Sequence, residues 1–403
     1  MQENFFERLL DLGTEWSIEN VEFDQTTKEI DIYLRFNLEA YKEKSGDTYY
    51  GIYDYREYRR WRHLDILQYK CFIKAKIPRL IDQDGKIKSL EVSWADTGTR
   101  HTLLFEKFAI DVLLATRNQT KSAELLRCGF NVVNNIIHTA SARGILRRDK
   151  DIIYKQLSVD EKSHKSNHQY VTVLSCPDTG HIIDIAKDRT KKAYKDLLNS
   201  CLSEKQKSEV KFISMDMWEA YMNGTKEVLP KAKLVHDRFH LIKYLNDAID
   251  KVRRRESKDY EELKNSRYSV LKNLGNLTEK QYYKFEDVLR INTKVSLAWR
   301  LRECFKSLFQ SENYQSAFSK YQDWLSFCVW EKIPEMMKVA EMFNRHLVGV
   351  CNALVENLSN AMAERLNGKI QEIKTIGRGY ATFENFRSAL LFFYGGLDLY
   401  PHK

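Results

Sequence analysis

The order of hydrophobic and polar residues divides the chain into a strand-rich start, a short helical stretch, an α/β stretch and a long helical remainder. Alternation with a period of two in "KEIDIYLRF" and "KCFIKAKIP" is typical of half-buried strands. The basic, aromatic segment "YDYREYRRWRHLD" lies between them, and we interpret it either as a third amphipathic strand or as a phosphate-binding segment. Residues 1–100 are therefore predicted to form a small β-rich module, which begins with a short helix at "NFFERLLDL".

Residues 101–150 have helical periodicity, and three helices are predicted in "FEKFAIDVLLATRNQTKSAELLRCGFNVVNNIIHTASARG". Small Ala123 in a helix and Gly129 in the turn after it fit a helix-turn-helix, a layout that many other three-helix modules share. If this segment binds DNA, we expect Asn131, Asn134 and Asn135, near the start of the last helix, to approach base edges.

The next stretch, residues 151–237, alternates between strand and helix patterns. "YKQLSVDE", "HQYVTVLSC" and "GHIIDIAKD" predict three consecutive strands. A helix follows at residues 190–201, then strand "VKFISMD", a helix ending near Pro230 and strand "AKLVHD". Residues 238–350 show only helical periods and are predicted to form an all-helical insertion, and residues 351–403 are mostly helical. The predicted fold class is α/β with a large helical content.

The chain of 403 residues is long enough for two or three domains. Its 65 Lys and Arg residues exceed its 56 Asp and Glu residues, and the excess occurs in runs. The arginines predicted to contact DNA phosphates are Arg59, Arg60, Arg62, Arg253, Arg254 and Arg255. A solvated surface is the alternative for each run.

Cysteine usage and the start of the chain indicate the cellular compartment. The seven cysteines include no CxxC pair, and nothing at the N-terminus resembles a signal peptide or a membrane span. We therefore expect a reduced, cytoplasmic protein with no membrane partner.

Two aspartates are predicted at the ends of strands in the α/β stretch, Asp160 after the first and Asp216 after the fourth. If these strands are neighbours, the two carboxylates repel each other, and a divalent cation relieves the repulsion. A third acid from an adjacent helix would complete a site for two Mg²⁺ ions about 3.5–4 Å apart, which suits in-line attack on a phosphodiester. Glu364, within the helical segment "LSNAMAERLNGKIQ", is the candidate, and Mn²⁺ is the alternative ion.

Each of these acids also has a purely structural interpretation. A strand-terminal aspartate commonly caps the next helix, and both Asp216 and Asp237 are placed to do so. An exposed, solvated side chain is the alternative for Glu364.

Four segments in order, "VDEKS", "MDMWEAY", "LVHDRFHLIKYLNDAIDKVRR" and "SNAMAERLNGKIQEIKTIGRGY", resemble the DDE transposases of bacterial insertion sequences, in particular the ISL-three group. "RRWRHLD", "IPRL" and "VSWAD" extend the resemblance over nearly the whole chain. It implies an RNase H-like catalytic core made of residues 151–237 and 351–403, which is interrupted by the helical insertion and preceded by a helix-turn-helix. It also places the catalytic, metal-binding triad on Asp160, Asp216 and Glu364.

Asp237 and His240 match the family's Asp-x-x-His pattern, so the resemblance gives them an auxiliary role. His240 would orient Asp237 or contact DNA near the site. The alternative is a structural pair that fixes the start of the helical insertion.

The resemblance implies a transposase that acts on double-stranded DNA, both at its element's terminal inverted repeats and at the target. It would cleave and join these DNAs as a homodimer, in a bacterial cytoplasm and associated with the nucleoid when DNA-bound. A structure-specific nuclease of the same fold and an inactive DNA-binding descendant of a transposase are the alternatives.

The N-terminal module departs from the family in one respect. Members usually carry two cysteine pairs of a zinc ribbon here, but the corresponding places read "AYKEKSGD" and "IPRLIDQDG". Cys71 alone cannot complete a tetrahedral zinc site. We predict that metal analysis of the purified protein will find well below one zinc ion per chain, whereas stoichiometric zinc would contradict a metal-free module.

Overall fold

The computed structural model describes residues 7, 10, 12–45, 49–82, 84–165, 169–291, 293–356, 360–377 and 379–402. Contacts group the chain into one unit of Met1–Arg148 with Ile373–Lys403 and another of Asp149–Glu372. The helix predicted at "NFFERLLDL" falls mostly outside the described residues.

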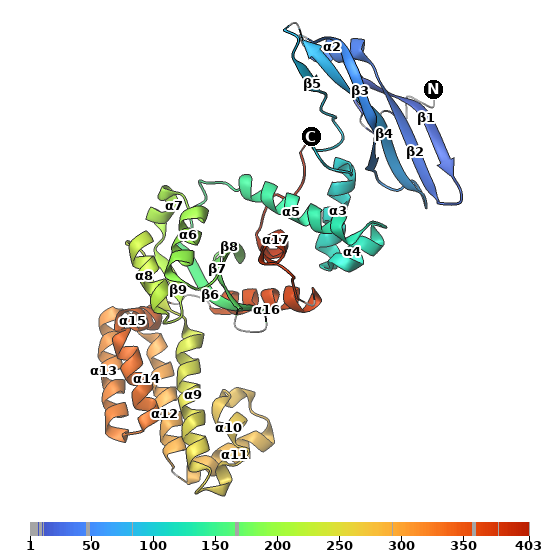
Figure 1. Ribbon diagram of the computed structural model, residues 1–403. Coiled ribbons are helices and arrows are strands. Elements are labelled where there is room, and N and C mark those ends of the chain that lie inside the picture. Colours follow the sequence, from blue (N-terminus) through green and yellow to red (C-terminus); the bar gives the residue numbers. More distant parts are fainter. Residues whose placement is uncertain are drawn as a thin grey trace. The chain divides into compact units, whose positions relative to one another are not determined.

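The first unit begins with a mixed β-sheet whose strand order is β1-β2-β4-β3 (Figure 1). The short strand β5 also pairs with β4. Its strands are β1 (Trp16–Asp24), β2 (Glu29–Phe36), β3 (Tyr49–Arg62), β4 (Lys70–Asp82) and β5 (Ile87–Ser89), and α2 (Leu38–Ser45) follows β2. The two alternating segments are strands as predicted, and "YDYREYRRWRHLD" lies mainly in β3. Its strand interpretation is therefore confirmed.

Aromatic rings and ion pairs hold this module together. One face of the sheet buries Trp94 between Trp16 and Trp61, with ring centroids 5.0 and 5.8 Å away. Cys71 is fully buried in the same core, and burial raises the pKa of its thiol to about 12. On the module's more polar side, Arg60 pairs with Asp31 at 2.8 Å.

The predicted helices of the first unit are α3 (Leu103–Thr116), α4 (Gln119–Leu125) and α5 (Phe130–Leu146). The side chains of Thr102 and Asn118 cap α3 and α4, and Gly129 precedes α5.

The C-terminal helix α17 (Phe383–Tyr394) packs on α5. The Ser141 hydroxyl donates to the Ser388 carbonyl oxygen at 3.0 Å, and a Cβ added at Gly144 would lie 2.6 Å from the side chain of Leu397. These close contacts explain why Ile373–Lys403 group with the first unit, although residues 351–403 as a whole were expected in the catalytic core.

The second unit contains a mixed sheet in the order β10-β9-β6-β7-β8. Its strands are β6 (Gln156–Lys165), β7 (Gln169–Cys176), β8 (His181–Lys187), β9 (Phe212–Met215) and β10 (Lys233–His236), with helices α6 (Lys191–Cys201), α7 (Glu204–Glu209) and α8 (Glu219–Val228) between them. β6 to β8 are antiparallel, whereas β9 and β10 run parallel to β6. The predicted element order is confirmed, except that α7 was missed and β6 continues past Asp160 because it pairs with β7.

Helices make up the rest of this unit, and the described part of residues 238–350 contains no strand. They are α9 (Arg238–Glu256), η1 (Glu261–Leu263), α10 (Arg267–Leu271), η2 (Leu274–Asn276), α11 (Glu279–Arg290), α12 (Lys294–Ser307), η3 (Leu308–Gln310), α13 (Tyr314–Glu331), α14 (Pro334–Arg345) and α15 (Leu347–Val355), followed by α16 (Asn360–Ile376). Among the described helices, none combines the length and apolar character that crossing a membrane requires.

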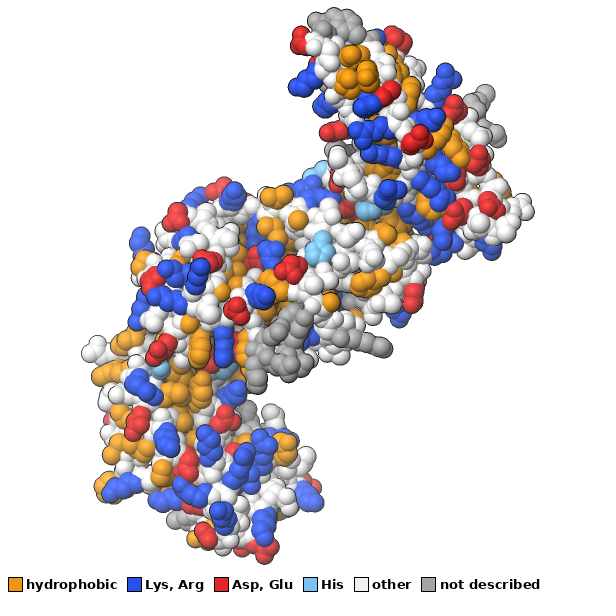
Figure 2. All heavy atoms as spheres, viewed as in Figure 1, with side chains coloured by type: hydrophobic (Ala, Val, Ile, Leu, Met, Phe, Trp, Pro, Cys, Tyr) orange, Lys and Arg blue, Asp and Glu red, His pale blue; other side chains and the backbone are white. Residues whose placement is uncertain are grey.

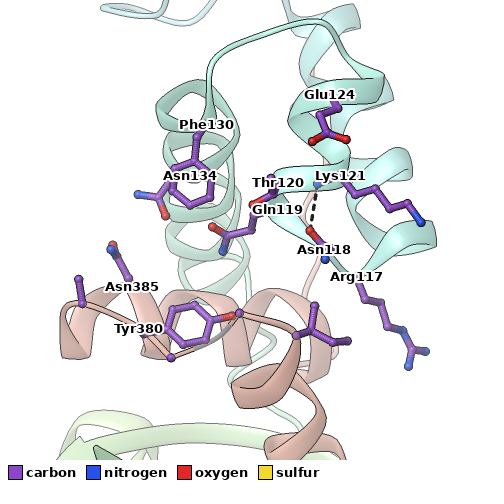
Figure 3. A pocket seen from close by; sticks show the side chains of 14 residues that line it. Arg117, Asn118, Gln119, Thr120, Lys121, Glu124, Phe130, Asn134, Tyr380 and Asn385 are labelled. Carbon is purple, nitrogen blue, oxygen red and sulfur yellow. Dashed lines mark hydrogen bonds between the residues drawn. The ribbon is translucent and has the colours of Figure 1, made fainter.

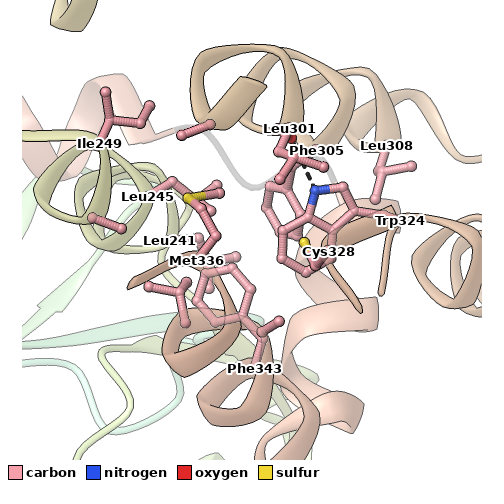
Figure 4. Close-up of a cluster of buried hydrophobic side chains, with 14 of the residues drawn as sticks. Leu241, Leu245, Ile249, Leu301, Phe305, Leu308, Trp324, Cys328, Met336 and Phe343 are labelled. Carbon is pink, nitrogen blue, oxygen red and sulfur yellow. Dashed lines mark hydrogen bonds between the residues drawn. The ribbon is translucent and has the colours of Figure 1, made fainter. Parts of the chain in front are cut away.

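Trp324 lies at the centre of the insertion's core (Figure 4). Its ring is 4.9 Å from that of Phe305 and 6.1 Å from that of Phe343, and its Nε1 donates to the Leu301 carbonyl oxygen at 2.9 Å. The side chain is fully buried, so it fills volume and also satisfies its own polar group.

We predict that Trp324→Ala lowers the free energy of unfolding by about 3–5 kcal/mol, because it leaves a large cavity. Urea denaturation followed by circular dichroism measures the change. Trp330, on the same helix but 82% exposed, is the matched control, and its replacement by Ala should cost less than about 0.5 kcal/mol. Equal losses in the two variants would contradict this description of the core.

Candidate active site

The parallel pairing of β6 and β9 brings the two predicted aspartates together. Ser158 lies opposite Ser214, and two residues further along each strand are Asp160 and Asp216. The predicted adjacency of their strands is therefore confirmed. β10 pairs in register with β9, so Asp237 follows at the same level of the sheet.

Asp160 and Asp216 line one pocket of about 280 Å³. His240, Lys243 and Tyr244 contribute to the pocket from α9. Acidic, basic and aromatic side chains from separate elements thus converge at the carboxyl ends of the parallel strands.

Asp216 does not cap the helix that follows it. α8 begins at Glu219, and its N-cap position is occupied by Trp218, which makes no side-chain capping bond. The Oδ1 atom of Asp216 accepts from the Met217 backbone N–H at 2.7 Å. The Tyr244 hydroxyl donates to both carboxylate oxygens, at 3.1 and 3.2 Å. Burial, reinforced by this neighbouring negative charge, raises the pKa of Tyr244, which therefore stays a hydrogen-bond donor at neutral pH.

Asp160 is held by its own strand. Its Oδ1 accepts from the Glu161 backbone N–H at 2.7 Å, and its Oδ2 lies 2.7 Å from Lys162 Nζ. The positive charge of Lys162 therefore offsets the negative charge of the Asp160 carboxylate.

A cation–aromatic cluster lies beside the two acids. Arg189 pairs with Glu161 at 3.1 Å. Its guanidinium carbon lies 4.6 Å from the Tyr170 ring centroid and 4.8 Å from that of Trp218. Stacking between the two rings fixes the guanidinium at the rim of the pocket.

Asp237 caps α9, as the structural interpretation predicted, because its side chain accepts from the Phe239 N–H at 2.7 Å. His240 Nδ1 lies 3.4 Å from Asp237 Oδ2, which is an ion-pair separation without hydrogen-bond alignment. Burial lowers the pKa of His240, but the Asp237 and Asp216 carboxylates raise it more, so it lies above its ordinary value.

The third predicted acid, Glu364, belongs to α16 by its backbone, but its side chain lies outside the described residues. Among the described side chains, no group of three or more His, Cys, Asp and Glu residues forms a metal site. The donor set that is described fits Mg²⁺ or Mn²⁺, because Asp160 and Asp216 supply hard carboxylate oxygens at one pocket.

Several of the arginines predicted to contact DNA are engaged within the protein. Arg62 is 8% exposed, pairs with Asp65 and lies near the Phe72 and Phe105 rings. Arg60 pairs with acids of β2, whereas Arg59 is exposed.

The arginine run at the end of α9 is also paired. Arg253 and Arg254 pair with the buried Asp250, and Arg255 pairs with Glu335. On the face seen in Figure 2, Lys and Arg side chains are scattered rather than gathered into one patch.

The asparagines at the start of α5 are more accessible. Asn131 and Asn135 are exposed, and half-buried Asn134 lines a separate pocket of the first unit.

Sequence reasoning missed Tyr244 and Lys162, which both contact the paired acids. Tyr244 follows His240 by four residues in α9, which places both side chains on one helix face. That spacing was an available signal. No comparable signal pointed to Lys162, because β6 was expected to end at Asp160.

The class of the protein follows from comparison with known families. A family model described as a transposase, of the DDE type of ISL3 elements, matches residues 157–390, more than half of the chain. The chain therefore belongs to the ISL3 family of DDE transposases, and the predicted family and transposase function are confirmed.

Known relatives resemble the chain over most of its length. It is 25% identical to the transposase for insertion sequence element IS1557 of Mycobacterium tuberculosis over 352 residues, which cover 80% of this chain and 78% of that protein. It is 24% identical to the transposase for insertion sequence element IS1001 of Bordetella parapertussis over 337 residues, which cover 81% and 82% of the two chains.

We predict that Asp237→Ala lowers the pKa of His240, because it removes a neighbouring negative charge, and destabilises α9 by about 1 kcal/mol through loss of its cap. Nuclear magnetic resonance titration in magnesium-free buffer measures the pKa, with the signal assigned by its loss in His240→Gln. Asp247→Ala, which removes an exposed acid of the same helix, should leave the pKa almost unchanged. An unaltered pKa in Asp237→Ala would show that Asp237 does not act on His240.

Proposed function

We propose that this transposase cuts and joins the DNA ends of its insertion sequence at the pocket formed by Asp160 and Asp216. The observation that carries the proposal is the convergence of these carboxylates on neighbouring parallel strands. Glu364 of α16 would supply the third carboxylate. The strand order supports an RNase H-like core, and α3 to α5 support a helix-turn-helix.

Two divalent ions bound by these acids would supply Lewis-acid activation of a phosphodiester and of the attacking oxygen. Tyr244 holds the Asp216 carboxylate in place through its hydroxyl. Exposed Lys243, which pairs with no acid among the described residues, contributes positive charge for a DNA phosphate at the pocket. When it is protonated, His240 would hold Asp237 and add to that positive charge.

The chemistry consists of two displacements at phosphorus. In the first, a water oxygen bonds to phosphorus and the bond to the 3′ oxygen breaks, which frees a 3′ hydroxyl. In the second, that hydroxyl attacks a target phosphodiester and displaces its 3′ oxygen. No side chain becomes covalently attached to DNA, so the mechanism needs no Ser or Tyr nucleophile.

Recognition of double-stranded DNA would come from the first unit. Asn131 and Asn135 are exposed at the start of α5, where the second helix of a helix-turn-helix reads the major groove. Arg59 would contact phosphates from β3. We expect the protein to bring two element ends together as a homodimer.

We predict that Asp160→Ala, Asp216→Ala and Glu364→Ala each reduce cleavage and strand transfer on the order of a thousandfold or more, because the acids act as one unit. DNA binding should be retained. The assay uses Mg²⁺ and DNA that carries the inverted repeats flanking the gene.

The matched control is Asp196→Ala, which removes an exposed acid of α6 and should leave both reactions intact. Cleavage without joining by the wild type would favour a nuclease. Binding without either reaction would favour an inactive descendant. Retained cleavage in Asp216→Ala would contradict the assignment of the acids.

A further inference from the structure

A second pocket lies within the first unit, remote in sequence from the two paired acids. It has a volume of about 700 Å³ and is formed by α4, the start of α5 and the described residues 376–377, 379–381 and 385 (Figure 3). A volume of this size is typical of a pocket that takes a small molecule or a nucleotide.

Four of the described lining side chains are amides, and the oxygen of one of them, that of Asn118, caps α4. Gln119 and Asn134 extend toward the space above Tyr380 in Figure 3. The buried Nε2 of Gln119 has no hydrogen-bond partner among the described residues. A buried amide group without a partner is costly, so this group is suited to a ligand that supplies an acceptor, and half-buried Asn134 offers a second amide beside it.

The remaining amide comes from the C-terminal part of the chain. Asn385 Oδ1 lies 2.7 Å from His138 Nε2, so the imidazole N–H donates to the amide oxygen. His138 Nδ1 is occupied by the Ser388 hydroxyl at 2.9 Å. This arrangement orients Asn385 and leaves its amide N–H groups as donors for the pocket.

Charge and an exposed aromatic ring indicate which ligand fits. Lys121 is exposed at the rim and pairs with no acid among the described residues, so it can contact a phosphate. Phe130, 48% exposed at the first position of α5, offers its apolar ring to a base or to a thymine methyl group. Glu124 also lines the pocket, and its carboxylate disfavours the O6 acceptor of guanine relative to the N6 amino donor of adenine.

We propose that this pocket binds an adenine base of the element-end DNA, so that Gln119, Asn134 and Asn385 determine sequence specificity. A carboxamide both accepts from the adenine N6 amino group and donates to N7, which makes Asn and Gln the usual partners of adenine. The inference rests on the proposed DNA-binding function and deepens it. It also makes the segment after α16 a component of DNA recognition.

The test exposes the full-length protein to random-sequence duplex DNA and, separately, to random-sequence single-stranded DNA, and sequences the bound fractions. The wild type should enrich adenine at one or more positions. Gln119→Ala and Asn385→Ala, one from each side of the pocket, should each reduce the preference at one of these positions about tenfold. If the variants lose the preference in the duplex pool, the pocket binds the edge of a paired adenine. If they lose it in the single-stranded pool, the pocket binds an unpaired adenine.

Two further variants keep the result specific. Lys121→Ala should weaken binding to all sequences equally and reduce its salt dependence, with the adenine preference intact. Asn20→Ala, which removes an exposed amide of β1, should change nothing.

Wild-type binding without an adenine preference, or the same preference in both pocket variants, would overturn the inference while leaving DNA binding in place. If the wild type bound neither pool, the proposed DNA-binding function would fail and this inference with it.

Discussion

The proposed active site depends on one short parallel pairing, that of β6 with β9. The paired residues are Gln156 to Ser158 on one strand and Phe212 to Ser214 on the other. Burial of Leu157 and Ile213 in the core fixes this register. A shift of either strand by one residue would turn its aspartate to the opposite face of the sheet, so the proximity of the two carboxylates is a consequence of hydrophobic packing.

Most of the basic side chains near the site and in the basic runs form ion pairs within the protein. Lys162 pairs with Asp160, and Arg254 pairs with the buried Asp250. The net charge of +9 is therefore a poor guide to DNA affinity. The cations that pair with no acid among the described residues, such as Lys121 and Lys243, are the better guide.

Local patterns predicted the elements, whereas long-range packing was beyond them. The period-two segments form strands, and the predicted order of elements from β6 to β10 is confirmed apart from the missed helix α7. Asp237 caps α9, as its structural interpretation predicted. The local sequence does not distinguish Arg62, which is buried, from Arg59, which is exposed in the same basic run. The burial of Arg62 could therefore not be predicted. Nor could the bond between His138 and Asn385, since 247 residues separate them and nothing local in the sequence records their contact.

The central claim, that the paired acids hold divalent ions, is tested most directly by Mn²⁺ binding to the protein–DNA complex, followed by electron paramagnetic resonance. The account predicts two Mn²⁺ ions per chain in the wild type and loss of binding in Asp216→Asn, which keeps the shape of the side chain but removes its charge. Unchanged stoichiometry and affinity in Asp216→Asn would contradict the account, because the ions would then be held elsewhere.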